Sequence, residues 1–344
     1  MPIKTSIIRV DASPTIGGGH LARCLLIAKK MITSGWGVRF VTAEKQAKDL
    51  IERSGYFCEE ITKKEKIPSH LIKKGILTVI IADINSNTIF DEDVEYKKYI
   101  NILHQQADLL LTFEDMVDHP YPADIVVIPY CGAEKLKIDY INKNTKYLLG
   151  PKYFPLRDEF KCITTNISNK VRKIVITMGG SDPEKITLKV LKALNNEIVE
   201  SDIMVIVGGM SEISDQDIKN SSSNIVEKIT IRRGVSNIAE LIANSDLAFT
   251  NSGLTKYEIS ALGIPTIIIS NTIQHAEYSE LFVKNGSAVH LGVHAFVESS
   301  DIINAYNDLN CNLAKRINMF KKSKLLFGIN GSDLIYNQIK NQLF

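Results

Sequence analysis

The chain has 344 residues, of which 44% are hydrophobic, and this length suits two domains of middling size better than one. Its 41 Lys and Arg residues stand against 39 Asp and Glu residues, so the net charge of +2 creates no field that would draw the protein to nucleic acid or to an anionic membrane. We therefore expect a small-molecule partner.

The cysteines and the N-terminus indicate a cellular compartment. Five scattered cysteines, odd in number and without a CxxC pair, argue against a disulfide framework and against a zinc site. The N-terminus lacks the apolar core of a secretory signal, and no run approaches the ~20 apolar residues of a membrane span. We expect reduced, mostly buried cysteines in a cytoplasmic protein without membrane insertion.

The first half alternates short β-branched runs with amphipathic stretches, which is typical of a parallel sheet covered by helices. The first helix runs from Leu21, with Leu25, Ala28 and Ile32 on the buried face, and ends at Gly35. Further helices are expected at residues 45–55 and 93–106. The expected strands are residues 6–10, 38–43, 78–83, 109–113 and 124–129.

A second series of the same kind follows the polar residues 164–172. Strands are expected at residues 173–178, 203–209, 225–230, 247–251, 265–270 and 288–291, and helices at residues 184–196, 236–244, 254–263 and 276–286. The predicted domains are residues 1–163 and 164–311, followed by Lys-rich helices at 312–344 to which we assign no chemistry. Two such open α/β sheets predict a cleft with ligands at the carboxyl ends of the strands.

The loop after the first strand, TIGGGHLARC, places glycines before the first histidine. Gly18 and Gly19 let a phosphate approach the main chain, although the pattern is neither GxGxxG nor a P-loop. His20 then either caps the helix or acts as a general base, because a helix N-terminus disfavours the imidazolium cation. Asp11, at the end of the first strand, would orient the imidazole.

The stretch ITMGGSDP repeats this arrangement in the second half. Gly179, Gly180 and Ser181 are expected to offer main-chain N–H groups to phosphate oxygens, just before a helix that starts at Glu184. Asp182 is expected to be the helix N-cap.

Two later strand ends carry further candidates. The small polar residues Asn251, Ser252 and Gly253 precede a helix whose Glu258 would accept from two ribose hydroxyls, unless it is an ordinary solvated glutamate. After the next strand, Gln274 and His275 should lie on the same rim, where both would alternatively be ordinary loop residues.

Four stretches together resemble a known family, the UDP-2,4-diacetamido-2,4,6-trideoxy-β-L-altropyranose hydrolases of pseudaminic acid biosynthesis. They are IRVDASPTIGGGHLARCLLIAKKM, LLGPKYFPLRDEF, VITMGGSDP and NSGLTKYEISALGIPTIIISNTIQHAEYSELFVKNG, and the match spans roughly residues 7 to 292. That family is related to the peptidoglycan N-acetylglucosaminyltransferases and has the GT-B fold, in which two Rossmann-like domains face each other across a cleft.

The resemblance implies metal-independent, inverting hydrolysis of a UDP-sugar without a cofactor, in nonulosonic acid or surface-glycan biosynthesis. His20 would be the base, Gly179 to Ser181 the diphosphate loop, Glu258 the ribose carboxylate, and Gln274 a sugar contact. Asp83 lies on the sugar side, where this chain reads DINSN in place of the family's DHYG and PYC in place of an asparagine pair.

Two alternatives stay open. A GT-B glycosyltransferase would use an acceptor hydroxyl in place of water, and a binding subunit would use His20 only to hold a phosphate. The acidic run 91–93 resembles a DxD metal motif, but its position at a helix start suits the helix dipole, so we expect no metal site. The basic segment 61–74 is expected to be a solvated face.

Overall fold

The computed structural model describes residues 4–13, 16–84, 93–114, 122–136, 144–197, 200–235, 237–326, 328 and 330–344. The chain divides into two units, each a parallel sheet with helices. Unit 1 comprises residues 1–156 and 328–344, and unit 2 comprises residues 157–327. This confirms the predicted pair of Rossmann-like domains.

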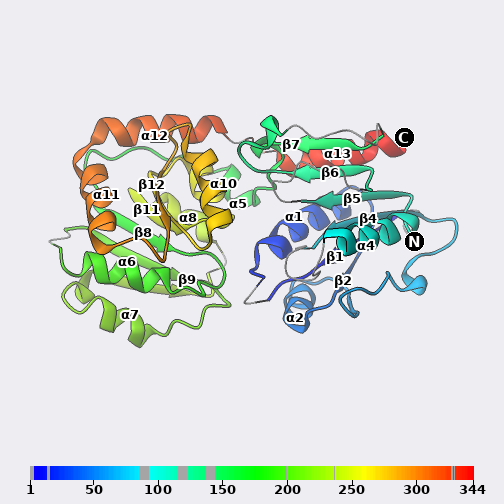
Figure 1. Ribbon diagram of the computed structural model, residues 1–344, viewed down its shortest axis with the longest axis horizontal. Coiled ribbons are helices and arrows are strands. Elements are labelled where there is room, and N and C mark those ends of the chain that lie inside the picture. The colour runs from blue at the N-terminus through cyan, green and yellow to red at the C-terminus, as the bar shows by residue number, and fades with distance from the viewer. Residues whose placement is uncertain are drawn as a thin grey trace. The chain divides into compact units, whose positions relative to one another are not determined.

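Unit 1 contains a seven-stranded parallel sheet in the order β3-β2-β1-β4-β5-β6-β7 (Figure 1). The strands are β1 (Lys4–Val10), β2 (Gly37–Thr42), β3 (Cys58–Glu60), β4 (Leu77–Asp83), β5 (Leu109–Phe113), β6 (Ile125–Ile128) and β7 (Lys146–Leu149). The helices are α1 (Gly19–Thr33), α2 (Lys45–Arg53), α4 (Asp93–Gln105) and α13 (Gly331–Leu343).

Both faces of this sheet are covered, which explains the continuous apolar runs of its central strands. Ile8 of β1 packs into one apolar core with α1, α2 and α13, whereas its neighbour Ile7 packs into a second core with α4. Because successive side chains of a strand point to opposite faces, the central strands contribute to both cores.

Helix α1 buries a different stripe from the one that its sequence predicts. Leu21, Cys24, Ala28 and Met31 are buried, but Ile32 is 47% exposed. The predicted end of the helix is confirmed, because α1 stops at Thr33 and Gly35 turns the chain with a φ of +81°.

Unit 2 contains a six-stranded parallel sheet in the order β10-β9-β8-β11-β12-β13 (Figure 1). The strands are β8 (Lys173–Thr177), β9 (Asp202–Val207), β10 (Ile229–Arg233), β11 (Leu247–Asn251), β12 (Thr266–Ser270) and β13 (Val289–Val293). The helices are α5 (Asp158–Lys161), α6 (Ile186–Leu194), α7 (Asp215–Ser221), α8 (Ile238–Ala243), α9 (Thr255–Leu262), α10 (Ile273–Val283), α11 (Ser299–Cys311) and α12 (Leu313–Leu326).

Several observed boundaries differ from the predicted ones. The chain enters unit 2 at Arg157, seven residues before the predicted boundary at 164. The predicted strand 225–230 begins only at Ile229, after a short 3-10 helix. The C-terminal segment is divided, because α12 belongs to unit 2 whereas α13 returns to unit 1.

Helix α13 completes unit 1 by packing apolar residues against it. Ile335 and Ile339 are fully buried in the core that contains Trp36 and the buried face of α1. The helix starts at Gly331, where an added Cβ would lie 2.1 Å from the main-chain oxygen of Phe154. Only glycine fits this contact without a shift of the backbone.

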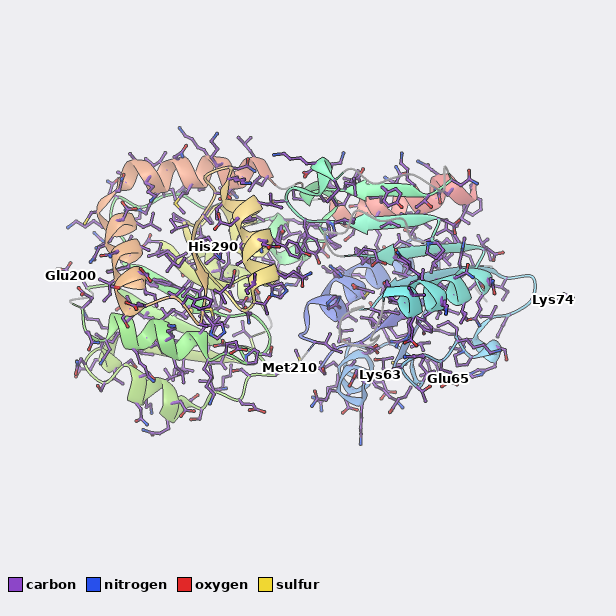
Figure 2. All side chains as sticks on the ribbon, viewed as in Figure 1. Lys63, Glu65, Lys74, Glu200, Met210 and His290 are labelled. Carbon is purple, nitrogen blue, oxygen red and sulfur yellow. The ribbon has the colours of Figure 1, made fainter. Side chains whose placement is uncertain are left out.

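The cysteines and the basic segment behave largely as expected. Cys24, Cys58 and Cys131 are buried, Cys162 and Cys311 are exposed, and all five are free thiols. Lys63, Glu65 and Lys74 lie on the surface of unit 1 (Figure 2), whereas the apolar residues Ile61, Ile67 and Leu71 of the same segment are buried. Within the described part of the chain, no helix combines the length and the apolar character that crossing a membrane requires.

We expect Gly331→Ala to destabilise unit 1 by about 1–3 kcal/mol, because the new methyl group overpacks the contact with the main chain of Phe154. Urea unfolding followed by tryptophan fluorescence measures this directly, since the chain's single tryptophan, Trp36, is buried in unit 1. Gly328→Ala is the matched control, because its Cβ would lie an ordinary 3.9 Å from the nearest atom. Equal unfolding midpoints for the two variants would contradict the role assigned to Gly331.

Candidate functional site

Each sheet has one point at which the strand order reverses. In unit 1, the chain runs outward from β1 through β2 to β3 and then returns to β4 on the other side of β1. In unit 2, the same happens between β8 and β11. Ligands of open parallel sheets bind at such points, outside the carboxyl ends of the strands, because the flanking loops diverge there.

At the reversal in unit 1, the structure brings His20 and Asp83 together. His20 is the second residue of α1 and Asp83 is the last residue of β4. The imidazole Nδ1 lies 2.6 Å from Asp83 Oδ1, and 17% of the His20 side chain is exposed, whereas the carboxylate is fully buried. The parallel sheet therefore joins two residues that are 63 positions apart in sequence.

Arg23 holds the Asp83 carboxylate in place. Its Nε donates to Oδ2 and its second terminal nitrogen donates to Oδ1, both at 2.5 Å, in a bidentate pair. The other terminal nitrogen donates to the Tyr130 hydroxyl at 2.7 Å, and the guanidinium lies 4.8 Å from the ring centre of Phe113. The buried Asp83 therefore has its counter-charge.

The charge of Asp83 fixes the tautomer that we assign to His20. Burial disfavours the carboxylate, but Arg23 and His20 outweigh it and hold the pKa of Asp83 well below its usual range. Nδ1 of His20 lies 2.6 Å from Asp83 Oδ1 and 3.1 Å from a terminal nitrogen of Arg23. Because an ionised carboxylate only accepts hydrogen bonds, we assign the Nδ1 proton to the shorter contact, in which Nδ1 donates to Oδ1. The lone pair of the neutral imidazole is then on Nε2, where it can accept a proton from a reacting hydroxyl.

The structure contradicts the role expected of Asp11. Its Oδ1 accepts from Arg9 at 2.5 Å, from the Thr42 hydroxyl at 3.0 Å and from the main-chain N–H of Ala43 at 2.7 Å. Asp11 thus anchors β1 to the end of β2, and Asp83, which was expected on the sugar side, orients His20 instead. Asp11 directly follows β1 and Asp83 is the last residue of β4, so in the sequence both are aspartates at strand ends, and only the sheet order distinguishes them.

At the reversal in unit 2, Asn251 ties the two predicted nucleotide loops together. Its Nδ2 donates to the main-chain oxygen of Met178 at 2.6 Å, and its Oδ1 accepts from the N–H of Gly253 at 3.0 Å. Gly208 supports the first loop, because a Cβ there would lie 2.2 Å from the oxygen of Gly179. Beside it, Met210, labelled in Figure 2, donates its main-chain N–H to the oxygen of Gly180 at 2.9 Å.

Asp182 occupies the N-terminus of the helix that follows this loop. The helix begins at Ile186, not at Glu184, and Asp182 accepts from the N–H groups of Ile186 at 2.8 Å and Thr187 at 3.0 Å. Lys185, and not Asp182, holds the N-cap position, but the Asp182 carboxylate caps the free amides as expected. Burial raises the pKa of this carboxyl group. The N–H groups of Ile186 and Thr187 are therefore engaged, so a phosphate would have to be bound by the loop that precedes them. Gly179, Gly180 and Ser181 stay candidates through their own main chain.

Glu258 on α9 is not an ordinary solvated glutamate, because it is largely buried and forms an ion pair with Arg157. Arg157 donates to both of its oxygens, at 2.7 and 2.9 Å, and also lies 3.2 Å from Glu159. Burial raises the pKa of Glu258 even though Arg157 stabilises the carboxylate. The side chain is 13% exposed.

The other predicted residues lie at the ends of β11 and β12. The Ser252 hydroxyl is 3.3 Å from both the side-chain oxygen and the main-chain nitrogen of Asn271. Gln274 and His275 are exposed in the first turn of α10, and Thr272 caps this helix by accepting from the N–H of His275. They share the predicted rim with Asn271, and their roles stay predictions.

Sequence reasoning missed Arg23, Tyr130, Arg157 and Lys256. All four lie within stretches that carry the family resemblance or depart from it, but a basic or phenolic side chain gives no signal of its role until its partner is known. Among the described residues, no group of three or more His, Cys, Asp or Glu side chains is placed to hold a metal ion. Asp91 and Glu92, and the side chain of Asp93, lie outside the described residues.

Comparison with curated proteins finds distant relatives. An uncharacterized protein of Methanocaldococcus jannaschii is 29% identical over 84% of this chain, and the spore coat polysaccharide biosynthesis protein SpsG of Bacillus subtilis is 24% identical over 62%. The chain spans only 60% and 62% of the lengths of these two relatives. No protein-family model matches.

A transferase and a solved structure extend these comparisons. The UDP-N-acetylglucosamine–N-acetylmuramyl-(pentapeptide) pyrophosphoryl-undecaprenol N-acetylglucosamine transferase of Vibrio atlanticus is 22% identical over 73% of this chain and 75% of its own length. The crystal structure of MurG from Acinetobacter baumannii superposes with a TM-score of 0.66 at 13% identity and covers 98% of this chain and 99% of that one. The fold is therefore GT-B, and these comparisons do not single out the hydrolase family.

We expect Asp83→Asn to destabilise unit 1 by about 3–5 kcal/mol, because it leaves the buried Arg23 without its counter-charge. Asp333→Asn is the control, since it breaks the exposed pair with Lys30 and should cost under about 1 kcal/mol. Urea unfolding followed by Trp36 fluorescence measures the free energy of unfolding of both variants and of the wild type.

The stability difference between wild type and Asp83→Asn has a defined pH dependence. The pKa of Asp83 is lowered by folding, so the ionised carboxylate stabilises the protein above its ordinary pKa of ~3.9, and this contribution is lost as the pH falls below that value. The stability difference between wild type and Asp83→Asn should therefore be full at pH 7 and shrink below about pH 4. A difference that does not change with pH would contradict the ionised state of Asp83.

Proposed function

We propose that this protein is an enzyme that uses a UDP-sugar donor and transfers the glycosyl group, with inversion, to a hydroxyl that His20 deprotonates. The observation that carries the proposal is the 2.6 Å contact between His20 Nδ1 and the ionised Asp83, because it leaves Nε2 as the proton acceptor. We place the reaction in surface-glycan biosynthesis, in keeping with the name of the relative SpsG.

The nucleotide half of the substrate is assigned to unit 2. The loops at residues 179–181 and 251–253 meet at the point where the strand order reverses, and Asn251 joins them. Glu258 lies on the helix that follows, where a carboxylate can accept from both hydroxyls of a ribose. The Vibrio relative acts, by its name, on a UDP-sugar, which supports uridine as the base.

The reacting hydroxyl is assigned to unit 1. As this oxygen attacks the anomeric carbon, Nε2 of His20 takes its proton, and the new imidazolium is stabilised by Asp83 through Nδ1–H. The bond between the anomeric carbon and the β-phosphate oxygen breaks, and its electron pair leaves with UDP. A diphosphate is a weak base, so it needs stabilisation of charge more than a proton. One displacement on one face inverts the anomeric centre.

Two hydroxyls compete for the role of nucleophile. An acceptor alcohol makes the protein a glycosyltransferase, which the transferase relative and the GT-B fold favour. Water makes it a UDP-sugar hydrolase, which the resemblance of four sequence stretches to the altropyranose hydrolases favours. The proposed residues are the same in both, and we place the transferase first.

We expect His20→Ala to lower the rate of UDP release from the preferred UDP-sugar by about 100-fold or more while UDP binding is kept, which is the usual scale for loss of a general base. UDP-N-acetylglucosamine and UDP-diacetamido-trideoxyhexoses, with and without N-acetylhexosamine glycosides as acceptors, are suitable probes. His104→Ala is the control, because His104 pairs with Asp124 at 3.0 Å elsewhere in unit 1. UDP release at the wild-type rate by His20→Ala would refute the assigned base.

Oxygen-18 water separates the two nucleophiles in the same assay. Hydrolysis places the label on the anomeric hydroxyl of the sugar and none on UDP, whereas transfer leaves the label out of both products and requires the added acceptor. Nucleotide binding without UDP release under any of these conditions would leave only a binding subunit and overturn the proposal.

We expect Glu258→Gln to weaken UDP binding by about tenfold and to change the binding of 2′,3′-dideoxy-UDP little, because the ribose hydroxyls are the groups of the nucleotide that would donate to this carboxylate. Glu159→Gln is the control, since Glu159 also lies next to Arg157 but is not on α9. Isothermal titration measures all four affinities. An equal loss for both nucleotides would show that Glu258 only orders Arg157.

A further inference from the structure

A buried lysine lies directly behind the second nucleotide loop of unit 2. Lys256 is the second residue of α9, and only 2% of it is exposed. Its Nζ donates to the main-chain oxygen of Ser252 at 2.9 Å and to the Ser279 hydroxyl at 3.2 Å. The ammonium group is therefore fixed to the main chain of the loop at residues 251–253.

Two aromatic rings and a serine hydroxyl surround this ammonium group and restrict its position. The rings of Tyr257 and Phe282 lie 5.4 and 5.8 Å from Nζ. Ser279 donates its own proton to the main-chain oxygen of His275 at 2.9 Å, so it must accept from Lys256. Lys256 thus connects the loop after β11 to α10 through Ser279.

A second chain of hydrogen bonds continues from Ser279 toward the surface. Ser270 lies 3.4 Å from Ser279 and 2.9 Å from Nε2 of His290, and His290, labelled in Figure 2, contacts Glu280 at 2.6 Å through Nδ1. His290 is 2% exposed in its side chain, whereas Glu280 is 59% exposed. Lys256 is therefore part of an ordered polar network and not a side chain that extends along a surface.

The charges of the neighbouring loop show why a positive charge at Lys256 would matter for an anionic ligand. Asp182 caps α6, so the first amides of that helix are already engaged and its carboxyl group lies near any phosphate held at residues 179–181. The two loops are joined through Asn251, so the ammonium behind one loop acts on a ligand held by both. In a site shielded from water, a fixed charge acts over several ångströms far more strongly than in solvent.

We propose that Lys256 is a positioning residue for the diphosphate of the nucleotide: it holds the Ser252 carbonyl and supplies positive charge to the phosphates from behind the loop. This inference rests on the proposed function, because it takes the ligand to be a uridine nucleotide. In this proposal two residues of α9 recognise different parts of the nucleotide: the charge of Lys256 acts on the phosphates, whereas Glu258 contacts the ribose.

A series of ligands that differ only in charge tests the role of Lys256. We expect Lys256→Gln to weaken the binding of UDP by about tenfold or more, that of UMP less, and that of uridine little, measured by isothermal titration. Gln keeps a donor for the Ser252 oxygen but removes the charge. Lys256→Met, whose unbranched apolar side chain suits the two aromatic neighbours, is the second variant if Gln does not fold.

Lys324→Gln is the matched control. Lys324 donates to the main-chain oxygen of Ala261 at 3.0 Å, at the opposite end of the same helix, so its loss should change none of the three affinities. Thermal unfolding without ligand shows which variants are folded.

The outcomes distinguish the inference from the proposed function. An equal loss for UDP and uridine would mean that Lys256 only supports the loop, and an unchanged UDP affinity would mean that its charge does not reach the phosphates; either result overturns the inference alone. A wild-type protein that binds neither UDP nor uridine would overturn the proposed function, and the inference with it.

Discussion

The ion pair between Arg23 and Asp83 is the interaction on which the proposed chemistry depends. Asp83 is fully buried, and a carboxylate in that position is stable only with a partner that supplies both charge and two donors. Once ionised, it fixes the imidazole of His20 in the tautomer that exposes a lone pair on Nε2. A neutral Asp83 would remove this constraint, and His20 would then have no defined tautomer. The ionised carboxylate of Asp83 therefore positions His20, and Arg23 keeps that carboxylate ionised and in place.

Unit 2 uses the same topology for a different purpose. Its loops meet where β8 and β11 diverge, and the side chain of Asn251 replaces the main-chain hydrogen bonds that the sheet no longer provides there. Asp182 and Lys256 place opposite charges on the two helices that start at these loops. The balance between them, and not a glycine-rich loop alone, would set the affinity of this unit for an anion. Glycine at position 208 matters because it lets the first loop lie against the main chain after β9.

The base proposed in unit 1 and the anion site proposed in unit 2 would suit glycosyl transfer from a nucleotide, because the two tasks need opposite environments. Deprotonation of a hydroxyl needs a neutral imidazole next to a carboxylate, whereas departure of a diphosphate needs donors and positive charge. The proposed residues would serve with water or with an alcohol, so the identity of the nucleophile would depend on what reaches His20.

The sequence by itself determined the two parallel sheets, the positions of most strands and the loops that carry the chemistry, because apolar periodicity and glycine-rich strand ends are local properties. It also singled out His20, and the capping role of Asp182 followed from its place before a helix. Only the tertiary structure decided that Asp83 and not Asp11 orients His20. Both are aspartates at strand ends, and the one that contacts His20 lies on β4, the strand that the sheet order places beside β1. Arg23, Arg157 and Lys256 emerged in the same way, because a buried charge is recognised only by the partner that lies next to it in the fold.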